Sequence, residues 1–186
     1  MARAYPETMS LSRPDPSVVR LRPAVAADAA ILMRWDKAPH VLACLTDDPD
    51  HHEAADWDEE LAAQSDVFRY FIAEVDGRSI GAMRDIDPAG EPNGYGGEIE
   101  PNLRALDIWI GEADALNRGH GTQMMTLALD ACFARPQVEA VVTDPLNSNT
   151  EAHRFYQRLG FRPEGRRVFN GTDDCLVHRL TRADWA

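Results

Sequence analysis

The stretch Leu116-Asn-Arg-Gly-His-Gly-Thr122 decides the fold, because it joins the apolar run LDIWI (106–110) to the helix-like segment TQMMTLALDACFA. Gly119 and Gly121 let backbone N–H groups approach a ligand closely, and a helix N-terminus adds partial positive charge that favours phosphate. Arg118 supplies a cation beside them. The turn lacks the third glycine of the dinucleotide fingerprint and the Lys-Ser/Thr pair of a P-loop, which excludes both motifs.

A second strand and helix follow this turn, in VEAVVTDP (138–145) and NTEAHRFYQRLGF (149–161). The apolar residues 138–143 predict a buried strand. Asn149 or Thr150 can cap the helix, and Gly160 can close it in the left-handed conformation. A strand, glycine turn, helix, strand and helix in this order can hold a pyrophosphate at the first helix N-terminus. We expect the rest of the chain to serve that unit.

Alternation and breaker residues predict the other elements. One hairpin turn is expected at Asp76-Gly77, a helix after Ala27-Asp28 that Pro39 ends, and a loop or broken helix over residues 40–53. The loop 87–102 is either a wall of a binding site or a surface excursion. Strands are expected at 18–23, 69–75, 79–86, 106–110, 166–171 and 175–180, and helices at 29–39 and 54–64. In the helix after the glycine turn, the residues expected to form the buried face are Met124, Leu127, Ala128, Ala131 and Cys132.

Size and composition indicate one soluble domain over residues 18–186 after a flexible tail at 1–17. The formal net charge of −12 makes nucleic acid an unsuitable partner, while it suits both a cationic substrate and plain solubility. No apolar run is long enough to span a membrane. Three separated cysteines predict a reducing, cytoplasmic setting. We expect no bound metal, because adjacent residues such as His51-His52-Glu53 seldom converge on one ion.

Asp107 is the only acid within the expected central strand. An ionised carboxylate that faced an apolar core would cost several kcal/mol. Its side chain is therefore expected to face a partner, water or a cleft.

The glycine turn, followed one strand later by Asn149-x-x-Ala-x-x-x-Tyr156-x-x-x-Gly160-Phe161, resembles the GNAT superfamily of N-acetyltransferases. More narrowly, the chain is similar to aminoglycoside 6'-N-acetyltransferases; the strand of Asp107, the Thr143-Asp144-Pro145 segment and the N-terminal region match in style. The resemblance is strong over residues 104–161 and looser elsewhere. Two departures stand out: Leu116 occupies a position where the family often has Gln or Arg, and the substrate loop carries only Tyr95 where the family is often rich in Trp.

This resemblance implies an α/β (α+β) GNAT fold, with a mixed, mostly antiparallel sheet flanked by helices and a V-shaped split for acetyl-coenzyme A. It implies that Asp107 acts as the base or positions the substrate, and that Tyr156 protonates the departing thiolate or, alternatively, only packs against the cofactor. His120 in the turn is expected to be exposed. The resemblance also implies a set of cofactor-binding residues: Ile108, Trp109, Ile110, Arg118, Gly119, His120, Gly121, Thr122 and Asn149.

The acceptor is expected to be a cationic amine, an aminoglycoside, held by carboxylates and an aromatic ring. The candidate contacts are Trp35, Tyr95, Glu98, Glu100 and Asp144, although any single acid among them could be solvated surface. Alternatives are another small amine or hydroxylamine of the siderophore type, a protein N-terminus, or a binding module without catalysis. A monomer or a homodimer is expected. No role follows from the sequence for His153 or His178.

Overall fold

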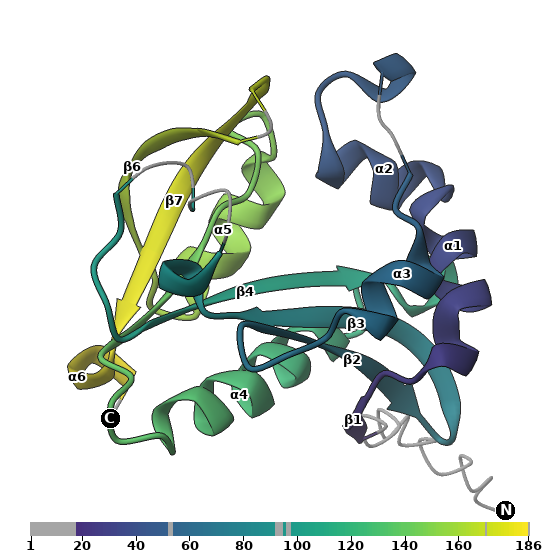
Figure 1. Ribbon diagram of the computed structural model, residues 1–186, viewed down its shortest axis with the longest axis horizontal. Helices are drawn as coiled ribbons and strands as arrows, with labels where there is room; N and C mark the ends of the chain where they lie inside the picture. Colours follow the sequence, from purple (N-terminus) through teal and green to yellow (C-terminus); the bar gives the residue numbers. More distant parts are fainter. Residues whose placement is uncertain (1–17, 52–53, 92–94, 96–97, 170, 186) are drawn as a thin grey trace, which may run out of the picture.

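The computed structural model describes residues 18–51, 54–91, 95, 98–169 and 171–185; the expected tail at 1–17 lies outside them, as does most of the His51-His52-Glu53 run. Seven strands form one sheet in the order β1-β2-β3-β4-β5-β7-β6 (Figure 1). The strands are β1 Val19–Pro23, β2 Phe68–Val75, β3 Arg78–Ile86, β4 Leu103–Ile110, β5 Ala140–Thr143, β6 Arg162–Phe169 and β7 Asp173–Thr181. The helices are α1 Ala29–Asp36, α2 Pro39–Leu45, α3 Trp57–Ala62, α4 His120–Phe133, α5 Thr150–Arg158 and α6 Arg182–Trp185, with short 3-10 turns η1 Ala26–Asp28, η2 Pro49–His51, η3 Pro88–Gly90 and η4 Ala113–Ala115.

The β2–β3 hairpin confirms the expected turn. Asp76 and Gly77 both have positive φ, at 51° and 78°, as a tight hairpin turn requires. Every other pair of neighbouring strands is also antiparallel, except β4 and β5, which run parallel. The expectation of a mixed, mostly antiparallel sheet is therefore confirmed.

Helices cover both faces of the sheet. Helices α4 and α5 pack on one face, where Met125, Leu129 and Tyr156 meet Leu106 and Leu180 in one buried cluster. Helices α1 and α3 pack on the other face, toward β2, β3 and β4 (Figure 1). The central strand is thus covered on both sides, which is why it reads as an apolar run.

The parallel pairing of β4 and β5 is short. Only Leu103↔Ala140, Arg104↔Val141 and Ala105↔Val142 are in register, yet β4 continues to Ile110. Beyond these pairs the two strands diverge, and β5 runs up with β7 and β6 while β4 stays with β3 (Figure 1). This divergence is the split that the resemblance implies.

Several local expectations need correction. Pro39 does not end the first helix, which stops at Asp36; it begins α2, because proline at the first helical position gives up only an N–H that would lack a partner anyway. Residues 40–45 are consequently helical. On α4, Leu127 and Ala131 are exposed, while Met125 and Leu129 are buried, so the apolar face is rotated from the expected one.

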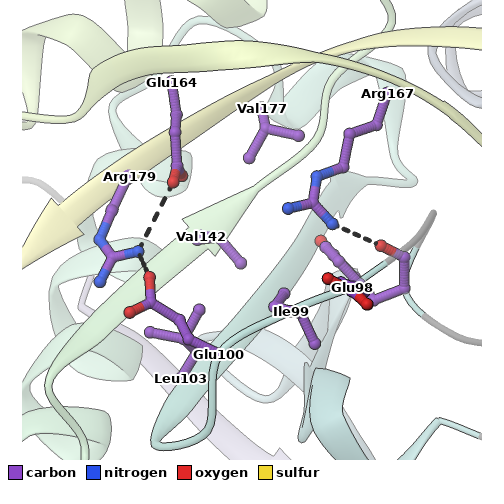
Figure 2. A pocket seen from close by; sticks show the side chains of 10 residues that line it. Glu98, Ile99, Glu100, Leu103, Val142, Glu164, Arg167, Val177 and Arg179 are labelled. Carbon is purple, nitrogen blue, oxygen red and sulfur yellow. Dashed lines mark hydrogen bonds and ion pairs between the residues drawn. The ribbon is translucent and has the colours of Figure 1, made fainter.

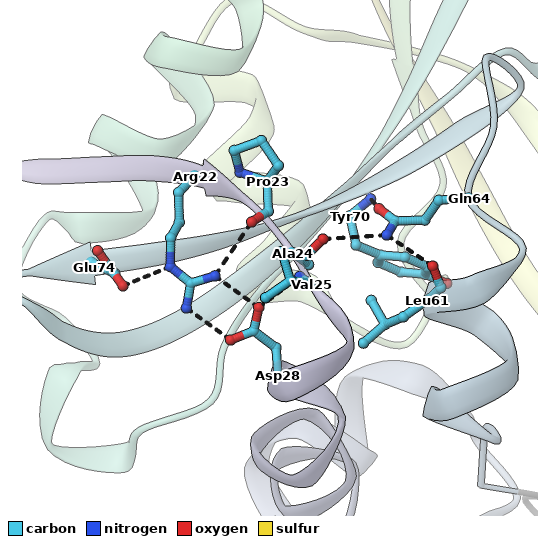
Figure 3. A network of polar contacts seen from close by, with 9 residues as sticks. All are labelled: Arg22, Pro23, Ala24, Val25, Asp28, Leu61, Gln64, Tyr70 and Glu74. Carbon is cyan, nitrogen blue, oxygen red and sulfur yellow. Dashed lines mark hydrogen bonds and ion pairs between the residues drawn. The ribbon is translucent and has the colours of Figure 1, made fainter.

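Asp28 does not cap α1 through its side chain, contrary to expectation. Its carboxylate accepts two hydrogen bonds from the Arg22 guanidinium, at 2.7 and 2.8 Å, and one from the Val25 N–H (Figure 3). Arg22 also donates to Glu74 at 2.8 Å. Gln64 joins the same region, because its amide group bonds the Ala24 carbonyl and its oxygen accepts from the β2 backbone. This network fixes α1 and α3 against the edge of the sheet.

No helix among the described residues is long and apolar enough to cross a membrane. Within the same residues, no group of three or more His, Cys, Asp or Glu side chains gathers as metal ligands would.

Candidate functional site

Two carboxylates lie where the sheet splits. Asp107 is two residues beyond Ala105, the last residue of β4 that pairs with β5, and Asp144 is two residues beyond Val142, the partner of Ala105. Because side chains alternate along a strand, both carboxylates leave the sheet on the face of α1 and α3. Each is half-buried. The split therefore carries a pair of acids at its mouth.

Their surroundings disfavour ionisation. Burial, followed by the charge of Asp144, raises the pKa of Asp107 to about 7, although the Arg84 guanidinium acts to lower it. Burial also raises the pKa of Asp144, against a hydrogen bond from Tyr95 whose hydroxyl donates to its Oδ1 at 2.5 Å. An arriving cation would relieve both groups, which suits a site for an amine.

A guanidinium that the sequence reasoning missed stands beside this pair. Arg84 on β3 lies directly opposite Asp107 in the β3–β4 register, and opposite Tyr70 on its other side. It forms an ion pair with Glu91 at 3.1 Å and lies over the rings of Phe68 and Tyr70. A signal existed in the sequence: Arg84 falls on the same alternation as Ala82 and Ile86, which are buried, so a charge in that row needed a partner.

Tyr156 reaches the split from the opposite face of the sheet, on α5. Its ring packs edge-on against Phe155 and Phe161, and the residue is only 7% exposed. Burial and the charges of Asp107 and Asp144 raise its pKa well above the ordinary value. It therefore remains a protonated phenol at any working pH.

Two histidines lie near Tyr156. His178 on β7 is fully buried, stacks on His153 with ring centroids 5.1 Å apart, and lies 6.0 Å from the Tyr156 ring. Its Nδ1–H donates to the Leu176 carbonyl at 2.9 Å. Burial lowers the pKa of His178, which keeps it neutral.

The glycine turn opens α4 as expected. Gly119 has φ of 84°, and the first helical hydrogen bond runs from the Gln123 N–H to the Gly119 carbonyl at 3.2 Å. The backbone N–H groups ahead of that bond have no helical partner, which is the arrangement that binds anions. A Cβ atom at Gly119 would meet nothing within 4 Å, and one at Gly121 would meet only the Phe155 ring at 3.7 Å. The turn thus leaves open space for a pyrophosphate.

The residues around that turn differ in exposure. Arg118 and Thr122 are exposed and available to a phosphate. His120, the first residue of α4, is 6% exposed, so the expectation of an exposed side chain is wrong. Asn149 caps α5, accepting from the Ala152 N–H at 3.0 Å, which commits its amide oxygen to the helix. Ile108, Trp109 and Ile110 follow Asp107 on the part of β4 that β5 does not pair.

Trp35 is not part of the acceptor wall that the sequence suggested. It is fully buried, and its indole Nε1–H donates to Glu112 at 2.9 Å. A Cβ atom at Gly111 would fall 2.1 Å from its ring, so Trp35 lies directly beneath the end of β4. Trp35 therefore supports that strand, and its buried ring is not available to the acceptor.

Glu98 and Glu100 lie away from Asp107, in a groove over β5, β6 and β7 (Figure 2). Glu100 is in an ion pair with Arg179, which also approaches Glu164 at 3.6 Å. Tyr95 belongs to both places, because its ring lines this groove while its hydroxyl bonds Asp144. Of the expected acceptor residues, only Asp144 belongs to the acidic pair, and only Tyr95 contacts it.

Known proteins are similar to this chain in sequence and fold. The profile of the acetyltransferase (GNAT) domain matches residues 24–169. The aminoglycoside N(6')-acetyltransferase type 1 of Klebsiella pneumoniae is 30% identical over 152 residues, covering 79% of this chain and 75% of that protein. A kanamycin resistance protein of Rhizobium radiobacter is 34% identical over 68 residues, covering 37% and 63%. The solved structure of the aminoglycoside acetyltransferase AAC(6')-Ib with coenzyme A and kanamycin aligns with a TM-score of 0.77 at 26% identity, over 90% of this chain and 96% of that one.

Proposed function

This chain belongs to the GNAT acetyltransferase family, and from that premise we propose that it transfers the acetyl group of acetyl-coenzyme A to the 6'-amine of an aminoglycoside antibiotic, and so confers resistance. The transfer is direct, within a ternary complex of enzyme, cofactor and acceptor. The relatives named above support the acceptor class.

The observation that carries the proposal is the acidic pair at the split. Asp107 and Asp144 face the side of α1 and α3, whereas the glycine turn and Tyr156 belong to the side of α4 and α5. An amine held by the pair can therefore meet an acetyl group that enters from the opposite face. A polycationic acceptor offsets the unfavourable charge of two neighbouring carboxylates.

The residues present fit acetyl-coenzyme A. The backbone N–H groups of the Gly119–Thr122 turn, with Arg118, would hold its pyrophosphate, and the unpaired side of β4 at Ile108–Ile110 would receive its acyl end. Bound there, the cofactor supplies an acyl thioester that an amine can attack. The remaining chemistry falls to side chains of this chain.

Asp107 is positioned to take the proton of the acceptor ammonium. A pKa of about 7 matches that task better than the ordinary aspartate value of about 3.9, because a general base works best when its pKa is near the working pH. Asp144 and Tyr95 orient the amine beside it. Tyr156 carries its proton before the reaction and can donate it to the leaving sulfur.

A thiol-release assay tests the function. The protein is incubated with acetyl-coenzyme A and a panel of acceptors: kanamycin- and tobramycin-type aminoglycosides, a hydroxylysine-type hydroxylamine, and a peptide with a free N-terminus. Release of coenzyme A with the aminoglycosides, and mass spectrometry that locates the acetyl group on the 6'-amine, is the expected result. Release of coenzyme A only with the hydroxylamine or the peptide would show that the acceptor is not an aminoglycoside. A thermal shift with acetyl-coenzyme A but no turnover with any amine would identify a binding module.

We also propose that the protein acts in the cytoplasm, without nucleic acid or membrane partners, as a monomer or homodimer. The free state of Cys44, Cys132 and Cys175 fits a reducing compartment, and a net charge of −12 opposes phosphate backbones. Light scattering after gel filtration distinguishes the two oligomeric states.

A further inference from the structure

A site for a polycation contains a cation of its own. Arg84 lies directly opposite Asp107 in the antiparallel β3–β4 pair. Opposite residues of such a pair have Cβ atoms about 5 Å apart and leave the sheet on the same face. The guanidinium therefore stands beside the place that we assign to the acceptor amine.

The surroundings of Arg84 hold it there in a defined orientation. Its guanidinium carbon lies 4.7 Å from the Phe68 ring centroid and 5.5 Å from that of Tyr70. One terminal nitrogen donates to Glu91 at 3.1 Å. The Tyr70 hydroxyl is itself fixed by a hydrogen bond of 2.8 Å to Glu60. Stacking and the Glu91 pair thus fix the plane of the guanidinium without using all of its N–H groups.

One of those N–H groups has no partner. The Arg84 Nε is buried and has no hydrogen-bond partner among the described residues. Buried donors are normally satisfied, so an unsatisfied one beside a ligand site points to an acceptor atom that the ligand brings. That atom cannot be a second ammonium, because two cations at this separation repel each other.

We propose that Arg84 is a specificity-determining residue, whose guanidinium donates a hydrogen bond to a hydroxyl oxygen three carbon atoms away from the amine held by Asp107. This rests on the proposed function and narrows it. The acceptor is an amine with a nearby hydroxyl group, as in an amino sugar, and not a bare polyamine. A second ammonium of the acceptor is excluded from the position beside Arg84.

The test compares two acceptors that differ only in that oxygen. Tobramycin and its 4'-deoxy derivative, which differ only in the 4'-hydroxyl group, are each assayed by coenzyme A release, and kcat/KM is measured for both. The wild-type enzyme is expected to favour the hydroxylated acceptor by about tenfold or more, the effect of one hydrogen bond to a charged group. In Arg84→Met the ratio falls to about one, and in Arg84→Gln, which keeps an N–H donor, it stays above one.

Taking the ratio separates this contact from charge. Loss of the Arg84 charge changes the ionisation of Asp107 for both acceptors alike, so that effect cancels. Arg69→Met is the matched control: Arg69 is 61% exposed, forms an ion pair with Asp66, and should leave the ratio unchanged. If Arg84→Met does not fold, as judged by its melting temperature and acetyl-coenzyme A binding, the wild-type ratio and Arg84→Gln still decide.

The outcomes separate the two proposals. Turnover of both acceptors at equal kcat/KM by the wild type overturns the role of Arg84 and leaves the aminoglycoside transferase intact. A wild-type preference that persists in Arg84→Met overturns it equally. No turnover of any aminoglycoside overturns the proposed function itself.

Discussion

Replacing Asp144 by Asn should move the acidic limb of the pH–rate profile to lower pH. In the wild type, activity should rise as Asp107 loses its proton, with a midpoint near the pKa of about 7. The negative charge of Asp144 is one cause of that raised value. Asn removes the charge but keeps an oxygen that can accept the Tyr95 hydrogen bond. The charged form of Asp107 then becomes more favourable, so its pKa falls and the base works in more acidic solution.

The magnitude follows from the geometry of the split. Neighbouring strands are about 4.8 Å apart where they pair, and these two strands diverge beyond their last pair, so we take a carboxylate separation of about 7 Å for the calculation. Two charges at that distance interact by about 2.4 kcal/mol at an effective dielectric constant of 20, or about 1.7 pKa units. Because both groups are only half-buried, solvent screening reduces this, and we expect a displacement of about one pH unit.

The assay is kcat/KM by coenzyme A release between pH 5 and 9, with two acceptors whose amines differ in pKa. The basic limb should follow the acceptor, and the acidic limb should follow the enzyme. Asp114→Asn is the control, because Asp114 is exposed and in an ion pair with Arg78, so its removal should leave the acidic limb in place. An acidic limb in Asp144→Asn that is unmoved, or moved upward, would refute the electrostatic coupling of the two acids.

The other predictions concern binding, chemistry and stability. Gly119→Val should weaken acetyl-coenzyme A binding at least tenfold in a fluorescence titration. Gly77→Val is the control, because Gly77 has a similar positive φ and equally open surroundings, and this change should only lower the melting temperature. Equal binding of acetyl-coenzyme A by both variants would show that the turn is not part of the cofactor site. Tyr156→Phe should lower kcat by about a hundredfold with little change in the KM for cofactor, and an unchanged kcat would leave the phenol a packing role. Asp28→Asn should lower the free energy of unfolding, measured in urea at pH 7, by about 2 kcal/mol, because bidentate pairing with a guanidinium lowers the pKa of this carboxyl. A lowered pKa in the folded state means that this stability difference between wild type and variant is present above the unfolded aspartate pKa and vanishes in acid. A stability difference that grows in acid would contradict the prediction. Arg182→Ala should lower the melting temperature by about 5 °C, because the guanidinium bonds the carbonyls that end α4, and a loss under 1 °C would show those carbonyls to be satisfied without it.

Much of the fold could be predicted because its signals are local. The Asp76-Gly77 turn needs two residues with positive φ, and the Asn149 cap and the Gly160 terminus of α5 depend on neighbours within four residues. The motif spacing from Gly119 to Tyr156 predicted the glycine turn, α4 and α5 in the order that the structure has. These features depend on backbone geometry that a residue type directly limits.

The acceptor side depends on contacts between distant segments. Glu98 and Glu100 come from the same loop as Tyr95, but the ion pair with Arg179 holds Glu100 over another part of the sheet. Trp35 was expected at the site, and tertiary packing beneath β4 buries it instead. Arg84 was missed because it comes to lie beside Asp107 only when β3 pairs with β4 in one register, and no single segment of the sequence specifies that register.

The position of Asp107 also has a consequence for solubility. It is the one charge in the strand segment Leu106-Asp-Ile-Trp-Ile110, which is otherwise rich in residues that favour intermolecular β-pairing. The open side of this segment resembles a sheet edge within the molecule, and a charge in such a run acts as a gatekeeper against self-association. Protonation near pH 7, or an Asp107→Asn substitution, removes that charge. Turbidity during mild heating should therefore increase below neutral pH, and a preparation of Asp107→Asn should aggregate before the wild type does.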